Sequence, residues 1–270
     1  MSALDMFTLS ACGLPFALFA TGSLRLWRRS RRKYASIIFR LAVGSAGFVA
    51  LALTLTPPLH ERAEVLFSVH MITHGVLMAA AAPLLILSRP GPLMLWALPG
   101  LLRRLLGSWT VQISASGPWR ALSRPLAASF AHGAAIWVWH MPAFFVGALH
   151  SEGLHWLQHA SFFFTALLFW WVIFGFRHLR SDAGASIACL FVTALHTGLL
   201  GALLTFSVRL WYPAAPGTAE WGLTAIEDQQ LAGVIMWIPV GLIYALAALA
   251  LAAQWISTSP LPKDLGNAAR

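Results

Sequence analysis

Residues 153–175 read GLHWLQHASFFFTALLFWWVIFG and contain no Asp, Glu, Lys or Arg. An α-helix rises about 1.5 Å per residue, so about 20 mostly apolar residues are enough to cross the hydrocarbon core of a bilayer. The stretch therefore predicts a transmembrane helix. It also carries His155 and His159 near its start. Because an ionisable side chain is costly inside a membrane, these two histidines are candidates for function.

The composition of the whole chain is typical of an integral membrane protein. Of its 270 residues, 59% are hydrophobic and only 10% are charged, and the mean hydropathy is +0.72. A soluble domain of this size cannot bury so much apolar surface, so lipid must cover part of it. The net charge of +9 lies between apolar runs rather than along one soluble face, which argues against a nucleic-acid partner. Cys12 and Cys189 lie in separate apolar stretches and form no disulfide framework or CxxC motif.

The apolar runs predict an all-α bundle of about seven transmembrane helices that forms a single integral-membrane domain over residues 1–270. The predicted spans cover residues 7–24, 35–56, 66–87, 125–147, 153–175, 184–207 and 231–254. The longest inner connection covers residues 88–124 and contains LLRRLL at 101–106. This pattern predicts a short amphipathic helix that lies on the cytoplasmic membrane surface.

The distribution of Lys and Arg predicts that the N-terminus lies outside and the C-terminus inside a bacterial plasma membrane. Cytoplasmic loops retain basic residues, whereas acidic residues say little about topology. In this orientation sixteen of the eighteen basic residues lie on the inner side, and only Arg62 and Arg209 lie outside. The sixteen include Arg40, one turn inside its span, because its long side chain can reach back to the headgroups.

Five of the ten histidines are predicted to share one layer near the outer surface. Spans 66–87 and 153–175 enter from outside with one histidine pair each, and span 125–147 exits there with a single histidine. The five are His70, His74, His140, His155 and His159. Residues four apart lie on the same face of a helix, so both members of each pair can point into the bundle.

Such a layer favours a metal site. Two imidazoles one turn apart suit a borderline or soft transition metal, and His140 supplies a third ligand from a neighbouring helix. Met71, Met141 and Met236 are predicted in the same layer, and thioethers favour Cu(I), although methionine is also common core filler. The alternative is that the histidines only form hydrogen bonds between helices or lie at the headgroup interface.

The remaining polar candidates have weaker claims. His196 is either a deeper ligand or a hydrogen-bonding partner of a neighbouring helix, with Gly198 and Gly201 allowing close helix approach. Asp228 is interpreted first as the N-cap of its own helix, and otherwise as an acceptor that orients a ligand histidine or receives an incoming cation. His132 is interpreted as a packing residue. His60 and His150 are predicted in solvated loops, and His178 among the cytoplasmic charges.

Several ordered motifs resemble the CtaG family of cytochrome c oxidase assembly factors, the multi-span proteins associated with caa-type oxidases. The motifs are HMITH (70–74), APLLIL (82–87), WVWHMP (137–142), LHWLQHASFFFTALLFWW (154–171), LHTGLLGALLTF (195–206) and DQQLAGVIMW (228–237). The resemblance covers about residues 60–240. The family often has Gln at the position of Thr73 and a Tyr-Asp pair after the proline of the WVWHMP motif, where this chain has Phe144, Phe145 and Val146.

The resemblance implies a non-enzymatic assembly factor for a haem–copper oxidase that handles copper and has oxidase subunits as partners. The matching residues are His70, His74, His140, His155, His159, His196 and Asp228. The leading hypothesis is that Cu(I) enters from the periplasmic side, is held by the histidine layer and passes to an oxidase subunit. Alternatives are a haem-binding redox protein, a metal-free scaffold for oxidase subunits, and a transporter, which the absence of an inverted repeat disfavours. Self-association stays open.

Overall fold

The computed structural model describes residues 12–29, 34–174 and 183–258, and every regular element in these ranges is helical. Five helical stretches are long and apolar enough to cross a membrane: Ala35–Leu55, Phe67–Ser88, Glu152–Ile173, Ala183–Thr205 and Ala225–Thr258. They coincide with five of the seven predicted spans. The all-α prediction and the membrane character of the chain are therefore confirmed.

Two of these stretches contain an internal π-helical segment. The first consists of α5 (Phe67–Gly75), η3 (Val76–Ala81) and α6 (Ala82–Ser88). The last consists of α14 (Ala225–Ile235), η5 (Met236–Val240) and α15 (Gly241–Thr258). The other three are α3 (Tyr34–Leu55), α12 (Glu152–Ile173) and α13 (Ala183–Thr205).

The count of seven spans is not confirmed. The predicted span 7–24 lies partly outside the described residues, and the helix there, α2 (Leu14–Arg29), has 16 residues. The prediction of one continuous helix over 125–147 was wrong, because α10 (Pro125–His140) ends before α11 (Pro142–His150) begins. Met141 between them is extended, at φ −66° and ψ 132°. Pro142 explains the break, since proline lacks an N–H and disfavours helical backbone in the residue before it.

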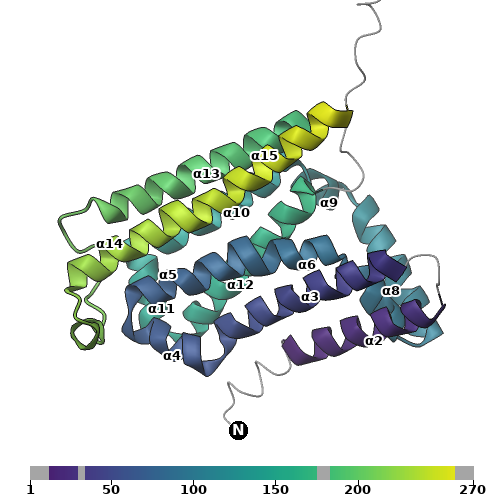
Figure 1. Cartoon of the computed structure of the whole chain (residues 1–270), viewed down its shortest axis with the longest axis horizontal. Coiled ribbons are helices and arrows are strands. Elements are labelled where there is room, and N and C mark those ends of the chain that lie inside the picture. The colour runs from purple at the N-terminus through teal and green to yellow at the C-terminus, as the bar shows by residue number, and fades with distance from the viewer. Residues whose placement is uncertain (1–11, 30–33, 175–182, 259–270) are drawn as a thin grey trace, which may run out of the picture.

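The long helices run alongside one another in Figure 1. Packing pairs are α13 with α15, α10 with α12 and α13, α3 with α6, and α14 with α5. The α13–α14 crossing is especially close, because a Cβ on Gly233 would lie 2.6 Å from the carbonyl oxygen of Gly201. Glycine at both positions lets the two backbones meet, as membrane helices commonly require. The predicted close approach of a helix at Gly201 is thus confirmed.

Shorter helices join the long ones. The predicted inner connection forms α7 (Pro90–Ala97), α8 (Gly100–Ala115) and α9 (Gly117–Leu122), while α4 (Pro57–Val65) and η4 (Thr218–Trp221) lie in the predicted outer connections. Helix α8 buries none of its residues, and Leu101, Leu105 and Trp109 are more than half exposed. The predicted helix at 101–106 is confirmed, and its position on a membrane surface stays a prediction.

Candidate metal centre

The structure brings all five histidines of the predicted layer together. His70 and His74 lie one turn apart on α5, His140 is the last residue of α10, and His155 and His159 lie one turn apart near the start of α12. The ring centroids are separated by 4.3 Å for His70–His74, 4.6 Å for His155–His159, 5.1 Å for His74–His159, 5.7 Å for His70–His155, and 6.3 Å for both His74–His140 and His70–His159. We call this group the histidine layer.

The histidine layer is fully buried at His74 and partly exposed at His155. His70, His74, His140 and His159 are each at most 4% exposed, whereas His155 is half-buried. An ion that approaches from the start of α12 therefore meets His155 first.

Two deeply buried histidines, His74 and His140, have ring nitrogens that form no hydrogen bond within the described residues and could bind a metal ion. His140 Nδ1 lies 2.7 Å from the carbonyl oxygen of Ile136. Because a carbonyl oxygen can only accept, Nδ1 carries the proton and Nε2 keeps its lone pair. Within the described part of the chain, His140 Nε2 and both ring nitrogens of His74 have no hydrogen-bond partner. Buried polar atoms without a partner are costly and uncommon, so a ligand is a natural explanation for them.

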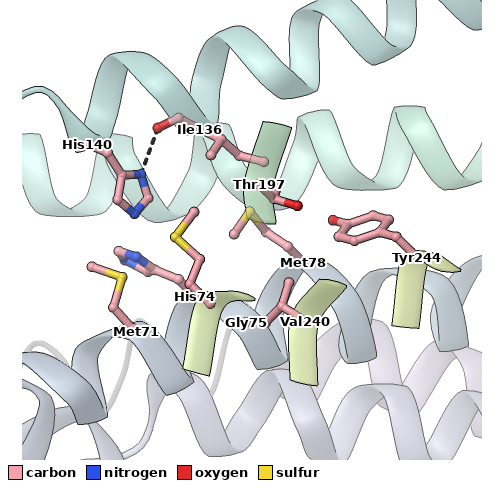
Figure 2. A pocket seen from close by; sticks show the side chains of 10 residues that line it. Met71, His74, Gly75, Met78, Ile136, His140, Thr197, Val240 and Tyr244 are labelled. Atoms are coloured by element: carbon pink, nitrogen blue, oxygen red, sulfur yellow. Dashed lines mark hydrogen bonds between the residues drawn. The ribbon is translucent and has the colours of Figure 1, made fainter. Parts of the chain in front are cut away.

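A small cavity adjoins His74 and His140. Its accessible volume is about 10 Å³, close to what one water molecule needs. The lining residues are Met71, His74, Gly75, Met78, Ile136, His140, Thr197, Met236, Val240 and Tyr244. Figure 2 shows the His74 and His140 rings on one side of this space, with the sulfur-bearing chains of Met71 and Met78 beside it.

Two of the three methionines that were predicted in this layer line the cavity, and their role as ligands stays a prediction. Met71 and Met236 are 2% and 5% exposed and line the cavity, but Met141 is 51% exposed and is not among its lining residues. Met78, which was not predicted in the layer, also lines the cavity. The signal was present, because Met78 follows His74 by four residues and so shares its helix face.

Asp228 serves a helix other than its own. Thr224 is the N-cap of α14 and forms a capping box with Glu227, so the predicted N-cap role of Asp228 was wrong. Instead, its buried carboxylate accepts the backbone N–H of Phe67 at 2.7 Å and that of Ser68 at 3.0 Å. These are the first two residues of α5, whose N–H groups have no partner within the helix. Asp228 thereby anchors the helix that carries His70 and His74.

Aromatic side chains cover the layer next to His70. Phe67, Phe145 and Tyr212 pack with centroids 4.3–5.3 Å apart, and Phe145 also contacts the His70 ring at 5.3 Å. The Tyr212 hydroxyl donates to the carbonyl oxygen of His140 at 2.7 Å. Burial raises the pKa of Tyr212, so this donor stays protonated. Gln229 of α14 fixes the position of Trp211, the residue before Tyr212, because the Gln229 Oε1 accepts the Trp211 N–H at 2.7 Å.

The other histidines lie apart from this group. His132 is fully buried, with Nδ1 3.2 Å from Thr165 Oγ1 and Nε2 3.0 Å from Tyr244 Oη, which confirms its predicted packing role. His196 accepts a hydrogen bond from Trp137 Nε1 at 3.3 Å, the second of its two predicted alternatives. His60 and His150 belong to the short helices α4 and α11 rather than to loops, and His150 is exposed. His178 lies outside the described residues.

The described residues contain no group of three or more His, Cys, Asp or Glu side chains already arranged to hold a metal ion. The histidine layer is therefore a gathering of rings that would need to turn before three nitrogens could meet at one point. The proximity predicted from sequence is confirmed, while the role of these residues as metal ligands stays a prediction.

Comparison with known proteins identifies the type of chain. The family model described as cytochrome c oxidase caa3 assembly factor (Caa3_CtaG) matches residues 17–258, which is nearly the whole sequence. No curated protein and no solved structure matches the chain. The match includes every residue of the histidine layer and of the methionine-lined cavity.

Proposed function

The chain belongs to the family of cytochrome c oxidase caa3 assembly factors, and from this premise we propose that it binds copper and delivers it to the oxidase at the periplasmic side of the membrane. The role is non-catalytic: the histidine layer takes up Cu(I) and releases it to an oxidase subunit. The observation that carries the proposal is the convergence of five imidazole rings from three helices, with neighbouring centroids 4.3–6.3 Å apart.

The chemistry of the donors supports a copper ion as cargo. Neutral imidazole and thioether groups are ligands that suit Cu(I). Within the described residues, the only buried carboxylate is that of Asp228, which is engaged by the start of α5. The accessible space of about 10 Å³ beside His74 and His140 favours a single ion over a haem macrocycle.

The proposed orientation places the layer on the periplasmic side. The histidines lie near the start of α5, at the end of α10 and near the start of α12, so these three helix ends meet at one side of the bundle. We propose that α2 and α10 also cross the membrane, which gives seven spans with the N-terminus outside. The 16 residues of α10 rise about 24 Å, which is short for a span, and α11 continues the chain at the outer end.

Copper titration of the purified full-length protein tests the proposal. Cu(I) is added under anaerobic, reducing conditions in competition with a chromophoric chelator, and the double variant His70→Ala/His74→Ala is compared with the wild type. We expect Cu(I) affinity to fall by at least about a hundredfold when two of the ligands are lost, which corresponds to about 2.7 kcal/mol. Equal affinity in the two proteins would remove the copper role from the histidine layer.

The matched control is His150→Ala. His150 is exposed, and its Nδ1 donates a hydrogen bond to the carbonyl oxygen of Val146 in its own helix, at 2.8 Å. This variant removes an imidazole from the same side of the bundle without touching the layer, so its Cu(I) affinity should equal that of the wild type. A melting curve for each variant separates lost binding from lost folding.

A further inference from the structure

We infer that the histidine layer contains two successive copper stations, of which the inner one is a Cu(I)-selective site built from His74, His140, Met71, Met78 and Met236. This inference deepens the proposed function and rests on it. The outer station comprises His70, His155 and His159, which do not line the methionine cavity. The inner station is the cavity itself, and Figure 2 shows His74, His140, Met71 and Met78 among the side chains that line it.

The inner histidines present nitrogen donors to this cavity. His140 keeps the Nε2 lone pair because its Nδ1 proton is bound by Ile136, and a hydrogen bond of this kind on one ring nitrogen is typical of a metal-binding histidine. His74 is 1% exposed and has no hydrogen-bond partner on either nitrogen within the described residues. Two buried imidazoles thus border one space with lone pairs available.

The three methionines give the cavity an uncharged lining with soft, polarizable thioether groups. Met71, Met78 and Met236 are all at most 5% exposed and all line the cavity. Thioether sulfur is a ligand for Cu(I) and a poor one for Zn(II) or Mg(II). The cost of burying an ion rises steeply with its charge, and the described lining offers no carboxylate to offset it. A monovalent soft ion is therefore the species that this cavity suits best.

The backbone at two of these methionines departs from regular α-helix. Met78 lies in the π-helical segment η3 and Met236 in η5. Such segments are rare and occur often at functional sites. A proline accompanies each segment: Pro83 lies just beyond η3, and Pro239 lies within η5. Because proline has no N–H, it interrupts the regular hydrogen bonding of the helix. Both segments border the same cavity, so Met78 and Met236, which are distant in sequence, line it together.

The positions of the rings define the order of the stations. His155 is the half-buried member, its ring stacks on that of His159 at 4.6 Å, and His159 lies 5.1 Å from His74. An ion can pass from His155 to His159 and on to His74 by exchanging one imidazole at a time. The outer imidazoles accept copper, and the thioethers retain it in the cuprous state until it is transferred.

X-ray absorption spectroscopy of the Cu(I)-loaded full-length protein tests this assignment, together with Cu(I) and Zn(II) titrations. The variant Met78→Leu/Met236→Leu removes two sulfurs at nearly constant volume, a swap that cores usually tolerate. Met141→Leu is the matched control, because Met141 is 51% exposed and outside the cavity. A melting curve establishes that each variant is folded.

In the wild type and in Met141→Leu we expect copper–sulfur scattering. In Met78→Leu/Met236→Leu we expect this scattering to decrease and Cu(I) affinity to fall about tenfold or more, while Zn(II) affinity stays within about twofold of the wild type. Cu(I) bound by nitrogen alone in the wild type would overturn the inner station and leave the proposed function standing. A wild-type protein that binds no copper would overturn both. The wild-type spectrum decides the matter even if the double variant does not fold.

Discussion

The carboxylate of Asp228 on α14 accepts the backbone N–H of Phe67, the first residue of α5, at 2.7 Å. The two residues are 161 positions apart in sequence. This bond and its companion to Ser68 link the last long helical stretch to the helix that carries His70 and His74. Since α14 leads directly into η5 with Met236, the same contact sets the relative position of both sides of the inner cavity.

Replacing Asp228 with Ala should destabilise the protein and loosen the site. The change removes two charge-assisted hydrogen bonds and leaves two buried N–H groups without an acceptor, at a cost of about 2–4 kcal/mol. Thermal unfolding in detergent measures this loss, and Cu(I) titration should show weaker binding. Glu227→Gln is the comparison, because Glu227 is an exposed capping-box residue of α14. A melting temperature for Asp228→Ala no lower than that of Glu227→Gln would contradict the anchoring role.

Replacing Gly233 with Ala should separate α13 from α14. The added Cβ would lie 2.5 Å from Thr205 Oγ1 and 2.6 Å from the carbonyl oxygen of Gly201. Backbone has to move to relieve the second contact, so we expect a loss of about 1–3 kcal/mol in the free energy of unfolding.

The control for this crossing is Gly107→Ala. A Cβ on Gly107 in α8 meets nothing within 4 Å, and alanine is the better helix former by about 0.5–1 kcal/mol. This variant should therefore be neutral or slightly stabilised in the same melting experiment. Equal melting temperatures for Gly233→Ala and Gly107→Ala would show that α13 and α14 lie farther apart than they do in the structure.

Replacing Tyr212 with Phe should cost about 0.5–1.5 kcal/mol near neutral pH, because the carbonyl oxygen of His140 loses its donor. Burial raises the pKa of Tyr212 in the folded protein above its unfolded value of about 10. The hydroxyl therefore stabilises the fold fully below about pH 10, and this contribution decreases as the pH rises above that value. Denaturant unfolding at pH 7 and pH 11 should show the advantage of the wild type over Tyr212→Phe shrinking at the higher pH. A pH-independent difference would contradict the burial of this hydroxyl.

Labelling with a membrane-impermeant thiol reagent tests the proposed orientation. In a background where Cys12 and Cys189 are replaced with Ala, Glu152→Cys at the start of α12 should react from the periplasmic side of intact cells or spheroplasts. Gln112→Cys in α8 should react only after the membrane is opened, and both positions are exposed in the structure. The reverse pattern would place the histidine layer on the cytoplasmic side and contradict delivery from outside.

Local pattern was enough to predict most of the helices and the histidine layer. The stretches around His70–His74 and His155–His159 are long, apolar and almost free of charge, so they can only be helical in a membrane. The spacing of four then places each pair on one face. The break at Pro142, which was not predicted, was also encoded locally by the restriction that proline places on Met141.

The partner of Asp228 and the exposure of Met141 could not be predicted in this way. Whether a carboxylate caps its own helix or another depends on which helix end packs beside it, and Phe67 is distant in sequence. Met141 was predicted in the layer and is exposed, whereas Met78 was not predicted and lines the cavity. Depth along a helix follows from residue count, but the direction of a side chain follows from the rotation of the helix.

By itself the sequence determined that this protein is a helical membrane protein and that five histidines lie at similar depth, because helix length and periodicity depend only on neighbouring residues. Only the tertiary structure decided that His74 and His140 share a cavity with Met71, Met78 and Met236, and that Asp228 holds α5. These features depend on contacts between segments that are distant in sequence. The close helix crossing at Gly201 and Gly233 and the two π-helical segments position these segments relative to one another.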